Sequence, residues 1–327
     1  MRLPVALTCG EPAGVGPELA VRARQALGAS LDFFWIGDPR HLPQDARFSL
    51  ITDPAEAHTI APDTLPVLPH AFAQDAVPGQ PALANAAGVI AVIARAVALV
   101  QSGQASALCT APIHKKALQD GADFAFPGHT EFLAHLALDV PVVMMLASPL
   151  LRVVPVTIHI PLADVPARLT GPLIAETIRL THHGLQRDFG IAHPRLAVAG
   201  LNPHAGEGGK MGREDIDLIA PVLHDLRDQG FALLGPLSAD TMFHPRARAT
   251  YDAAICMYHD QALIPIKTLD FDGGVNVTLG LPFVRTSPDH GTAFDIAGQG
   301  IARPDSLIAA LKLAAEMVDR RGQWRGP

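Results

Sequence analysis

The sequence has few features that would place the protein outside a cell or on a nucleic acid. Its three cysteines, Cys9, Cys109 and Cys256, are widely spaced and form no CxxC pair, which predicts reduced core thiols in a cytoplasmic protein. The net charge of −7 argues against a nucleic-acid-binding surface. The segment 1–8 is too short for the apolar region of a signal peptide, so we expect none.

Long uninterrupted apolar runs are also missing. The longest one, residues 81–100, contains Asn85 and Arg95, and therefore predicts a buried helix and not a membrane span. Only 17% of the residues are charged and 49% are hydrophobic, as in a well-buried globular protein. A chain of 327 residues is longer than one core usually serves, so we expect two lobes.

Two common nucleotide-binding motifs are absent. The Gly/Pro-rich loop at residues 9–18 follows a predicted strand and opens a helix, which can present backbone N–H groups to an anion. It lacks the GxGxxG spacing, and a loop that only turns the chain is an equally good interpretation. Gly209 and Lys210 do not form a P-loop, because His204 stands where a glycine is required and Met211 follows the lysine.

The chain alternates predicted strands with predicted helices. Strands are expected at 3–8, 31–36, 48–51, 65–68, 105–110, 142–146, 151–156, 195–201, 231–234 and 253–257. Helices are expected up to about 27, at 80–101, from 111, from 130 to 138, and at 171–189, 213–229 and 305–320. This alternation predicts an α/β protein with a mostly parallel sheet and antiparallel strand pairs in one lobe.

Three histidines each follow a predicted strand. They are His159, His204 and His259. In open α/β sheets, ligands bind outside the carboxyl ends of the strands. One such histidine is more often a cap or a surface residue, but three imidazoles at one sheet edge suit a divalent metal with an open coordination position.

Two further segments could bind an anion. In the first, FPGHTEFL, we expect Thr130 to cap a helix and His129 to lie beside its N-terminus. That segment is either an ordinary helix start or an anchor for an anionic ligand. In the second, Lys267 follows the His259-Asp260 pair by one apolar stretch.

Seven stretches resemble the 4-hydroxythreonine-4-phosphate dehydrogenase family of vitamin B6 biosynthesis. They are GEPAGVGPE, FPGHTEFLA, PVTIHIPL, GLNPHAGEGG, GPLSADTMF, YHDQALIPIK and VNVTLGLPFVRTSPDHGTAFDIAG. The HGTAFDIAG part is also similar to the dinucleotide loop of isopropylmalate and isocitrate dehydrogenases. The resemblance implies their two-lobed fold with the active-site cleft between the lobes. Residues 1–109 and 269–327 would form the cofactor lobe, and 110–268 the lobe for metal, substrate and dimer contacts.

The resemblance also implies a set of site residues. The family's metal ligands fall on His159, His204 and His259. Its substrate-binding residues fall on His129, Thr130, Lys267, Asn276 and Arg285, and the dinucleotide loop contributes His290, Gly291, Thr292 and Asp295. Asp295 contacts the cofactor or only caps the following turn.

The acid/base groups are left open. Asp240 and Asp260 are candidates for orienting a ligand or transferring a proton, and a helix cap or surface ion pair is an equal alternative for each. Lys267 is a third catalytic candidate, although a purely electrostatic role is simpler. Lys267 and Arg285 would neutralise the two anionic groups of the substrate.

The implied reaction is oxidation of 4-phosphooxy-L-threonine by NAD or NADP. The 3-oxo acid product then decarboxylates to 3-amino-2-oxopropyl phosphate. Three imidazoles suit Zn²⁺ best, with Co²⁺ and Mg²⁺ as alternatives. The resemblance further implies a homodimer with shared active sites.

Three other functions remain open at this point. A paralogous dehydrogenase would act on another four-carbon phosphorylated hydroxy acid, of the phosphothreonate or phosphoerythronate type. A phosphate acyltransferase would share the fold but would not need the three histidines or the HGTAFDIAG loop. A non-catalytic protein that only binds a metal or a nucleotide would not need the three histidines, the two cationic side chains and the dinucleotide loop together.

Overall fold

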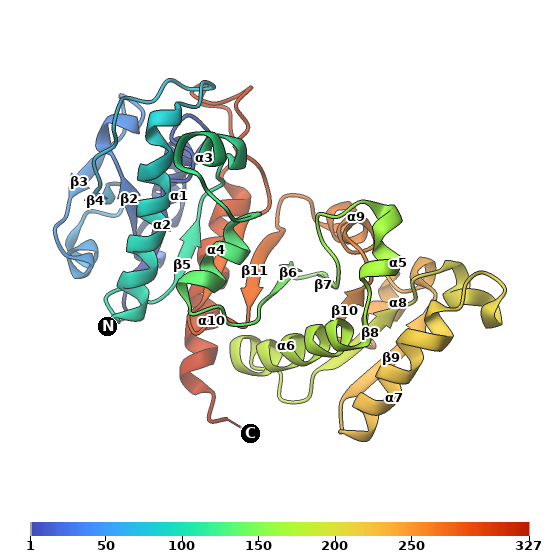
Figure 1. Ribbon diagram of the computed structural model, residues 1–327. Coiled ribbons are helices and arrows are strands. Elements are labelled where there is room, and N and C mark those ends of the chain that lie inside the picture. The colour runs from blue at the N-terminus through green and yellow to red at the C-terminus, as the bar shows by residue number, and fades with distance from the viewer. Residues whose placement is uncertain (1, 327) are drawn as a thin grey trace. The chain divides into compact units, whose positions relative to one another are not determined.

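The computed structural model describes residues 2–326 and divides the chain into two compact units (Figure 1). Unit 1 comprises the chain up to Pro141 together with Leu281–Asp319, and unit 2 comprises Val142–Gly280 with the residues from Arg320 onward. These boundaries lie later than those expected at 109/110 and 268/269. The first boundary lies later because the helices after residue 110 pack on the long helix α2 of unit 1, and the second because Val275–Leu279 pairs with a strand of unit 2.

The sheet of unit 1 is entirely parallel. Its strand order is β3-β4-β2-β1-β5-β12. The strands are β1 (Val5–Thr8), β2 (Phe33–Gly37), β3 (Phe48–Leu50), β4 (Leu65–Pro69), β5 (Leu108–Thr110) and β12 (Arg285–Pro288). The central strands β1, β2 and β5 are buried along their whole length, which explains their continuous apolar sequences.

Helix α2 is the main core helix of unit 1. It packs on β1, β2 and β5 and buries Val89, Val92, Ile93, Ala96 and Val97. With the turn before it, Leu83–Gln101 is long and apolar enough to cross a membrane by composition, but this packing identifies it as the buried helix that the sequence predicts. The helices of this unit are α1 (Gly16–Leu27), α2 (Ala86–Gln101), α3 (Lys115–Ala122), α4 (His129–Leu136) and the start of α10 (Asp305–Gln323).

The sheet of unit 2 is mixed, as predicted for one lobe. Its order is β11-β6-β7-β10-β8-β9; β6 pairs antiparallel with β11 and β7, and the other pairs are parallel. The strands are β6 (Val143–Ala147), β7 (Arg152–Pro155), β8 (Arg195–Ala199), β9 (Ala232–Leu237), β10 (Ala253–Cys256) and β11 (Val275–Leu279).

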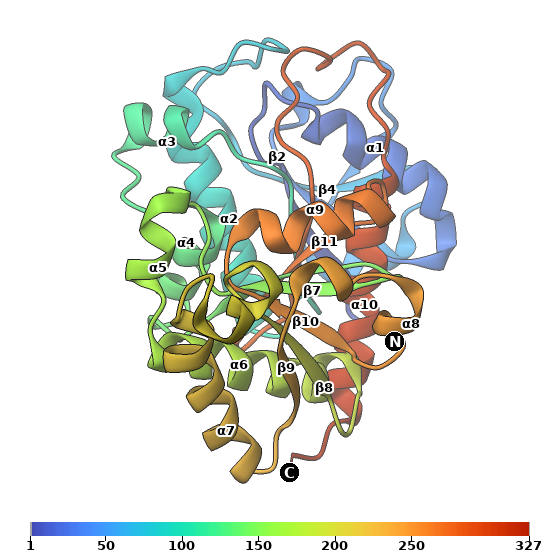
Figure 2. The same cartoon turned by 90° about the vertical axis from the view of Figure 1, so that its right-hand side faces the viewer.

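Helices cover both faces of the unit 2 sheet. Helix α9 (His259–Leu269) packs on β6, β7 and β10, and α6 (Gly171–Phe189) packs on β6 and β11 from the opposite face (Figures 1 and 2). The remaining helices are α5 (Val165–Arg168), α7 (Ala220–Asp228) and α8 (Pro245–Arg248). Helix α6 has the predicted bounds because Thr170 caps its N-terminus and Gly190 ends it in a left-handed conformation.

Some local predictions are wrong. Thr130 does not cap α4, because the extended Gly128 precedes the helix and Thr130 lies inside it. The predicted helix at 213–229 begins instead with a π-helical turn, Asp215–Ile219, before α7. Helix α9 was not predicted, because it carries Pro265, which normally argues against a helix interior.

Candidate functional site

Two of the predicted metal ligands meet in unit 2. His159 follows β7 and His259 follows β10, and these neighbouring strands pair in parallel with Pro155 opposite Cys256. The two imidazole ring centroids lie 5.7 Å apart. Both side chains line a cavity of about 260 Å³ together with Tyr258 and Asp260. The register of the two strands therefore produces the convergence that the sequence predicts for this pair.

The backbone at His159 is held in an unusual conformation. Its φ is +52°, in the left-handed region that few residues other than glycine adopt. The preceding Thr157 fixes this segment, because its hydroxyl donates to the carbonyl oxygen of Met257 over 2.7 Å. Such strain costs about 1–3 kcal/mol and persists where the surroundings impose it, commonly at functional sites.

His259 is oriented by its neighbour. It is the first residue of α9, and its Nδ1 lies 2.7 Å from Oδ1 of Asp260. With Nδ1–H donating to the carboxylate, Nε2 keeps its lone pair. A carboxylate that orients a histidine in this way is the usual second partner of an imidazole metal ligand.

His204 lies on a different segment of unit 2. It occupies the turn Pro203–Gly209 that follows β8. Among residues 2–326, no group of three or more His, Cys, Asp or Glu side chains is arranged to hold a metal. The described residues therefore bring His159 and His259 together and form no three-ligand group that includes His204.

The turn that carries His204 has left-handed backbone from residue 204 to residue 208. Its entry is anchored by Asp215, which is fully buried. The Asp215 carboxylate accepts hydrogen bonds from the backbone N–H groups of Leu201 and Asn202, at 2.8 and 3.2 Å, and from Asn202 Nδ2 at 3.0 Å. Sequence reasoning missed Asp215, because its partners lie more than ten residues away along the chain.

A buried positively charged side chain, Arg285, lies in unit 1. This residue of β12 is 2% exposed, and one of its Nη atoms donates to the hydroxyl of Thr110 over 2.7 Å. Burial lowers the pKa of Arg285 to about 10, while the Cys109 thiol and Glu131 act in the opposite direction. The guanidinium therefore remains charged at neutral pH, as a buried cation suited to an anionic ligand.

His129 lies beside this cation as a neutral group. Burial lowers its pKa well below the ordinary value, and the positive charges of Arg285 and Lys115 lower it further. Its Nε2 is buried and has no hydrogen-bond partner within the described part of the chain. Lys115, the first residue of α3, packs against Gly128, where a Cβ atom would lie 3.4 Å from Nζ. Lys115 belongs to no recognisable motif, so the sequence alone does not mark it as a site residue.

The remaining predicted residues of unit 2 are more dispersed. Lys267, in the last turn of α9, lies over Phe271 with Nζ 5.8 Å from the ring centroid. Asn276 is in β11, and its Oδ1 is buried without a hydrogen-bond partner among residues 2–326. Asp240 is exposed and accepts a hydrogen bond of 2.5 Å from the Ser238 hydroxyl. None of these contacts by itself identifies a proton-transfer group.

The predicted dinucleotide loop packs on the Gly/Pro-rich loop at the start of α1. The backbone N–H of Val15 donates to Thr292 O over 3.0 Å, and a Cβ at Gly14 would lie 2.8 Å from the same oxygen. Gly291 is exposed, and a Cβ there would meet nothing within 4 Å. Asp295 is also exposed, and its backbone oxygen accepts from Gln299 Nε2. The loop therefore leaves open space beside Gly291.

Comparison with known proteins gives matches over most of the chain. Residues 29–314 match the model of the family described as pyridoxal phosphate biosynthetic protein PdxA. The chain is 63% identical over 322 residues to the 4-hydroxythreonine-4-phosphate dehydrogenase of Paracoccus denitrificans (strain Pd 1222), which covers 97% of this chain and 98% of that protein. It is 64% identical over 318 residues to the protein of the same name from Roseobacter denitrificans (strain ATCC 33942 / OCh 114), with 97% and 98% covered.

A solved structure agrees with these matches. The crystal structure of 4-hydroxythreonine-4-phosphate dehydrogenase from Klebsiella pneumoniae superposes with a TM-score of 0.87. It is 38% identical to this chain, and the superposition covers 97% of this chain and all of that one.

Proposed function

This chain belongs to the family of the pyridoxal phosphate biosynthetic protein PdxA, as its motifs predict, and we propose that it oxidises 4-phosphooxy-L-threonine with NAD or NADP. The 3-oxo acid formed would lose CO₂ to give 3-amino-2-oxopropyl phosphate. It is a dehydrogenase by its full-length similarity to enzymes of that name. The observation that carries the substrate assignment is the buried cation Arg285 beside the neutral His129.

The cluster in unit 1 binds one anionic group of the substrate. Arg285 offers a planar fork of donors that matches a phosphate or carboxylate, and the Thr110 hydroxyl holds that fork in place. His129 stays neutral between two cations, so it donates a hydrogen bond without the cost of a third positive charge. Thr130, in the first turn of α4, adds a hydroxyl at the same helix end.

In this proposal a divalent metal would be held by imidazoles from two chains. His159 and His259 of one chain would supply two nitrogens, and His204 of a second copy would supply the third, because the described residues of one chain form no three-ligand group. Nitrogen donors favour Zn²⁺ or Co²⁺ over Mg²⁺. When bound, the ion supplies the Lewis acidity that favours ionisation of the substrate hydroxyl and stabilises charge during loss of CO₂.

The other residues of unit 2 have supporting roles. Asp260 keeps Nε2 of His259 available by accepting from Nδ1. Lys267 and Asn276 bind the second anionic end and a hydroxyl of the substrate. Asp240 is the acid/base candidate that no ion pair engages among the described residues, and its carboxylate accepts from the Ser238 hydroxyl. The three buried free cysteines agree with a reducing cytoplasm, where this enzyme acts as a homodimer.

The proposed function is tested by an NADH-absorbance assay with 4-phosphooxy-L-threonine, before and after removal of metal with a chelator. We expect NAD(P)-dependent turnover that the chelator abolishes and Zn²⁺ or Co²⁺ restores. A phosphothreonate- or phosphoerythronate-type substrate is assayed in parallel. Faster turnover of that substrate, or no reduction of NAD(P) with either one, would contradict the proposed function. Phosphate-dependent acyl transfer without NADH formation would favour an acyltransferase.

The dinucleotide loop is tested with Gly291→Val. His290, Gly291, Thr292 and Asp295 are proposed to contact the cofactor, and a side chain at 291 would occupy space that no other part of the described chain fills. We expect the KM for NAD to rise by about tenfold or more, with kcat for bound cofactor less affected and the melting temperature unchanged. Gly14→Ala is a control that disturbs the packing of the loop. Its Cβ would lie 2.8 Å from Thr292 O, so this variant should lower the melting temperature. A folded Gly291→Val protein with the native KM for NAD would show that this loop does not bind the cofactor.

A further inference from the structure

Another cavity lies in unit 2, at the other end of the two strands that the histidine pair follows. Its volume is about 150 Å³. Residues 149–152, which lead into β7, line it together with Arg248, Tyr251 and Asp252, which precede β10. Because β7 and β10 run parallel, this cavity lies at their amino ends, whereas the two histidines lie beyond their carboxyl ends. Cavities for drug-sized ligands measure about 300–1,000 Å³, so this one admits only a small ion or molecule.

Arg248 lines this cavity with a guanidinium that the protein uses only in part. Its Nη1 donates to the carbonyl oxygen of Leu150 over 2.7 Å, which holds the guanidinium against the turn before β7. Its Nε is buried and has no hydrogen-bond partner within the described residues. A buried donor without an acceptor is destabilising, because it has lost water without a replacement. An acceptor bound in the cavity would satisfy it.

Arg152 supplies a second positive charge, at the start of β7. Its guanidinium carbon lies 5.0 Å from the ring centroid of Phe189, and its Nη1 donates to the backbone carbonyl oxygen of Asp252 over 3.2 Å. Burial lowers the pKa of Arg152, whereas the charge of Asp252 acts in the opposite direction. An arginine still stays protonated at neutral pH, so this charge has lost part of its hydration and is available to an anion.

The one carboxylate that lines the cavity, within the described chain, is used by a third arginine. Asp252 accepts from the backbone N–H, Nε and Nη2 of Arg195, at 2.8, 3.2 and 3.1 Å. Burial opposes ionisation of Asp252, but these hydrogen bonds and the charges of Arg195 and Arg152 outweigh it, so its pKa is lowered. Burial raises the pKa of Tyr251 to about 12, so the phenol adds no negative charge. Three arginines therefore surround one ionised carboxylate, which leaves two positive charges unbalanced.

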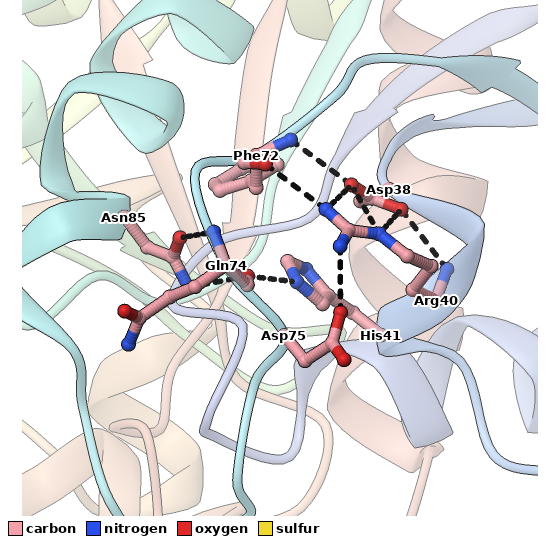
Figure 3. A network of polar contacts seen from close by, with 7 residues as sticks. All are labelled: Asp38, Arg40, His41, Phe72, Gln74, Asp75 and Asn85. Atoms are coloured by element: carbon pink, nitrogen blue, oxygen red, sulfur yellow. Dashed lines mark hydrogen bonds and ion pairs between the residues drawn. The ribbon is translucent and has the colours of Figure 1, made fainter.

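An arginine network in unit 1 shows the contrast. Arg40 lies between Asp38 and Asp75, with one Nη atom 2.7 Å from each carboxylate (Figure 3). Its charge is therefore balanced inside the protein. Neither Arg152 nor Arg248 forms an ion pair with a carboxylate among residues 2–326, because their described partners are backbone oxygens and an aromatic ring.

We propose that this cavity binds a small tetrahedral oxyanion of the phosphate class. Nε of Arg248 donates to one of its oxygens, and the planar fork of the Arg152 guanidinium donates to others. The two unbalanced charges match the charge of about −1.5 to −2 that a phosphomonoester carries at pH 7. The volume admits inorganic phosphate or the phosphate end of a small ester, and it excludes a dinucleotide. The site shares no residue with the cluster of Arg285 and His129 in unit 1 and does not depend on the proposed function.

The test is a calorimetric titration of inorganic phosphate into full-length, metal-free Arg285→Ala protein, so that neither a bound metal nor Arg285 contributes. Sodium chloride keeps the ionic strength constant. We expect one phosphate to bind per chain. Addition of Arg248→Gln should weaken this binding at least about tenfold, because a charge-assisted contact is lost. The matched control is Arg246→Gln, at an exposed position of α8 outside the cavity wall, which should leave the affinity unchanged.

Hydrogen exchange of the native protein is a second test, which needs no variant to fold. Phosphate should slow exchange of the backbone amides in residues 148–152 and 248–252, which the contact between Arg248 and Leu150 joins. Glycerol 3-phosphate is titrated in parallel. Tighter binding than that of inorganic phosphate would identify a phosphomonoester as the ligand, and weaker binding would identify the free ion.

Three results would overturn the proposal. They are phosphate binding that Arg248→Gln does not weaken, equal weakening by Arg248→Gln and Arg246→Gln, and native protein in which phosphate protects neither segment from exchange. None of these measurements uses turnover. An inactive protein can therefore still show the oxyanion site, and an active dehydrogenase can lack it.

Discussion

His159→Ala protein is expected to lose turnover by at least about a thousandfold, because loss of a ligand removes several kcal/mol of Lewis-acid stabilisation at about 1.4 kcal/mol per decade. Metal content, measured by atomic absorption after dialysis, should fall with it. The fold should survive, because the His159 side chain is exposed and β7 ends before it. A His159→Ala protein with one metal per chain and a normal rate would remove this residue from the site.

Mixing of inactive variants then tests which ligands share a chain. In a hybrid dimer of His159→Ala and His204→Ala chains, one site collects both lesions and the other regains the native set, so up to about half of the native activity should return. His159→Ala mixed with His259→Ala is the matched control and should stay inactive, because the close pair of imidazoles comes from one chain. Recovery in the second mixture and not in the first would overturn this division of the ligands.

Arg285→Ala should lower kcat/KM for the phosphorylated substrate about ten- to hundredfold. Charge-assisted hydrogen bonds contribute about 1.5–3 kcal/mol, and the lost partner is a buried cation. Arg285→Lys keeps the charge but not the planar fork, so its kcat/KM should fall between those of the alanine variant and the native enzyme. The pKa of about 10 predicts that the native Arg285 stays protonated throughout the neutral range.

The control for Arg285 is a surface arginine of the same unit. Arg47 is exposed and pairs with Asp63 over 2.6 Å, and Arg47→Ala should leave kcat/KM unchanged. Circular dichroism and the melting temperature distinguish a lost contact from a damaged core. A well-folded Arg285→Ala enzyme with native kcat/KM would show that this cation does not bind substrate.

Much of the fold is predictable because local signals agree with the packing. The buried strands β1, β2 and β10 are continuous apolar runs, and the N-cap Thr170 and the following Gly190 define α6. Helix α9 could not be predicted in the same way, because Pro265 contradicts the pattern locally while packing on three strands compensates for it. The unit boundaries carry no linker composition, so only the contacts of the helices after residue 110 reveal them.

The part of the site that lies directly after strands could be predicted from the sequence. His159 and His259 follow adjacent parallel strands, so their convergence follows from topology. The position of His204 depends on a turn whose anchor, Asp215, comes later in the sequence and carries no motif of its own. Arg152 and Arg248 belong to elements distant in sequence, and only folding places both in the wall of one cavity.

The left-handed turn after β8 has a consequence for how this loop can change by mutation. His204, Ala205 and Glu207 all have positive φ, which costs an L-residue about 1 kcal/mol or more, while glycine adopts it freely. Substitutions of Ala205 or Glu207 by glycine would therefore relieve strain in the folded state, yet they would also widen the range of backbone states the loop can visit. If residues 204–208 were mutated at random, the left-handed backbone would decide first which side chains fold. Valine and isoleucine would destabilise the turn through backbone strain, whether or not they affect activity. The thermal stability of the protein and the conformational order of this loop can thus change independently, and selection for one need not improve the other.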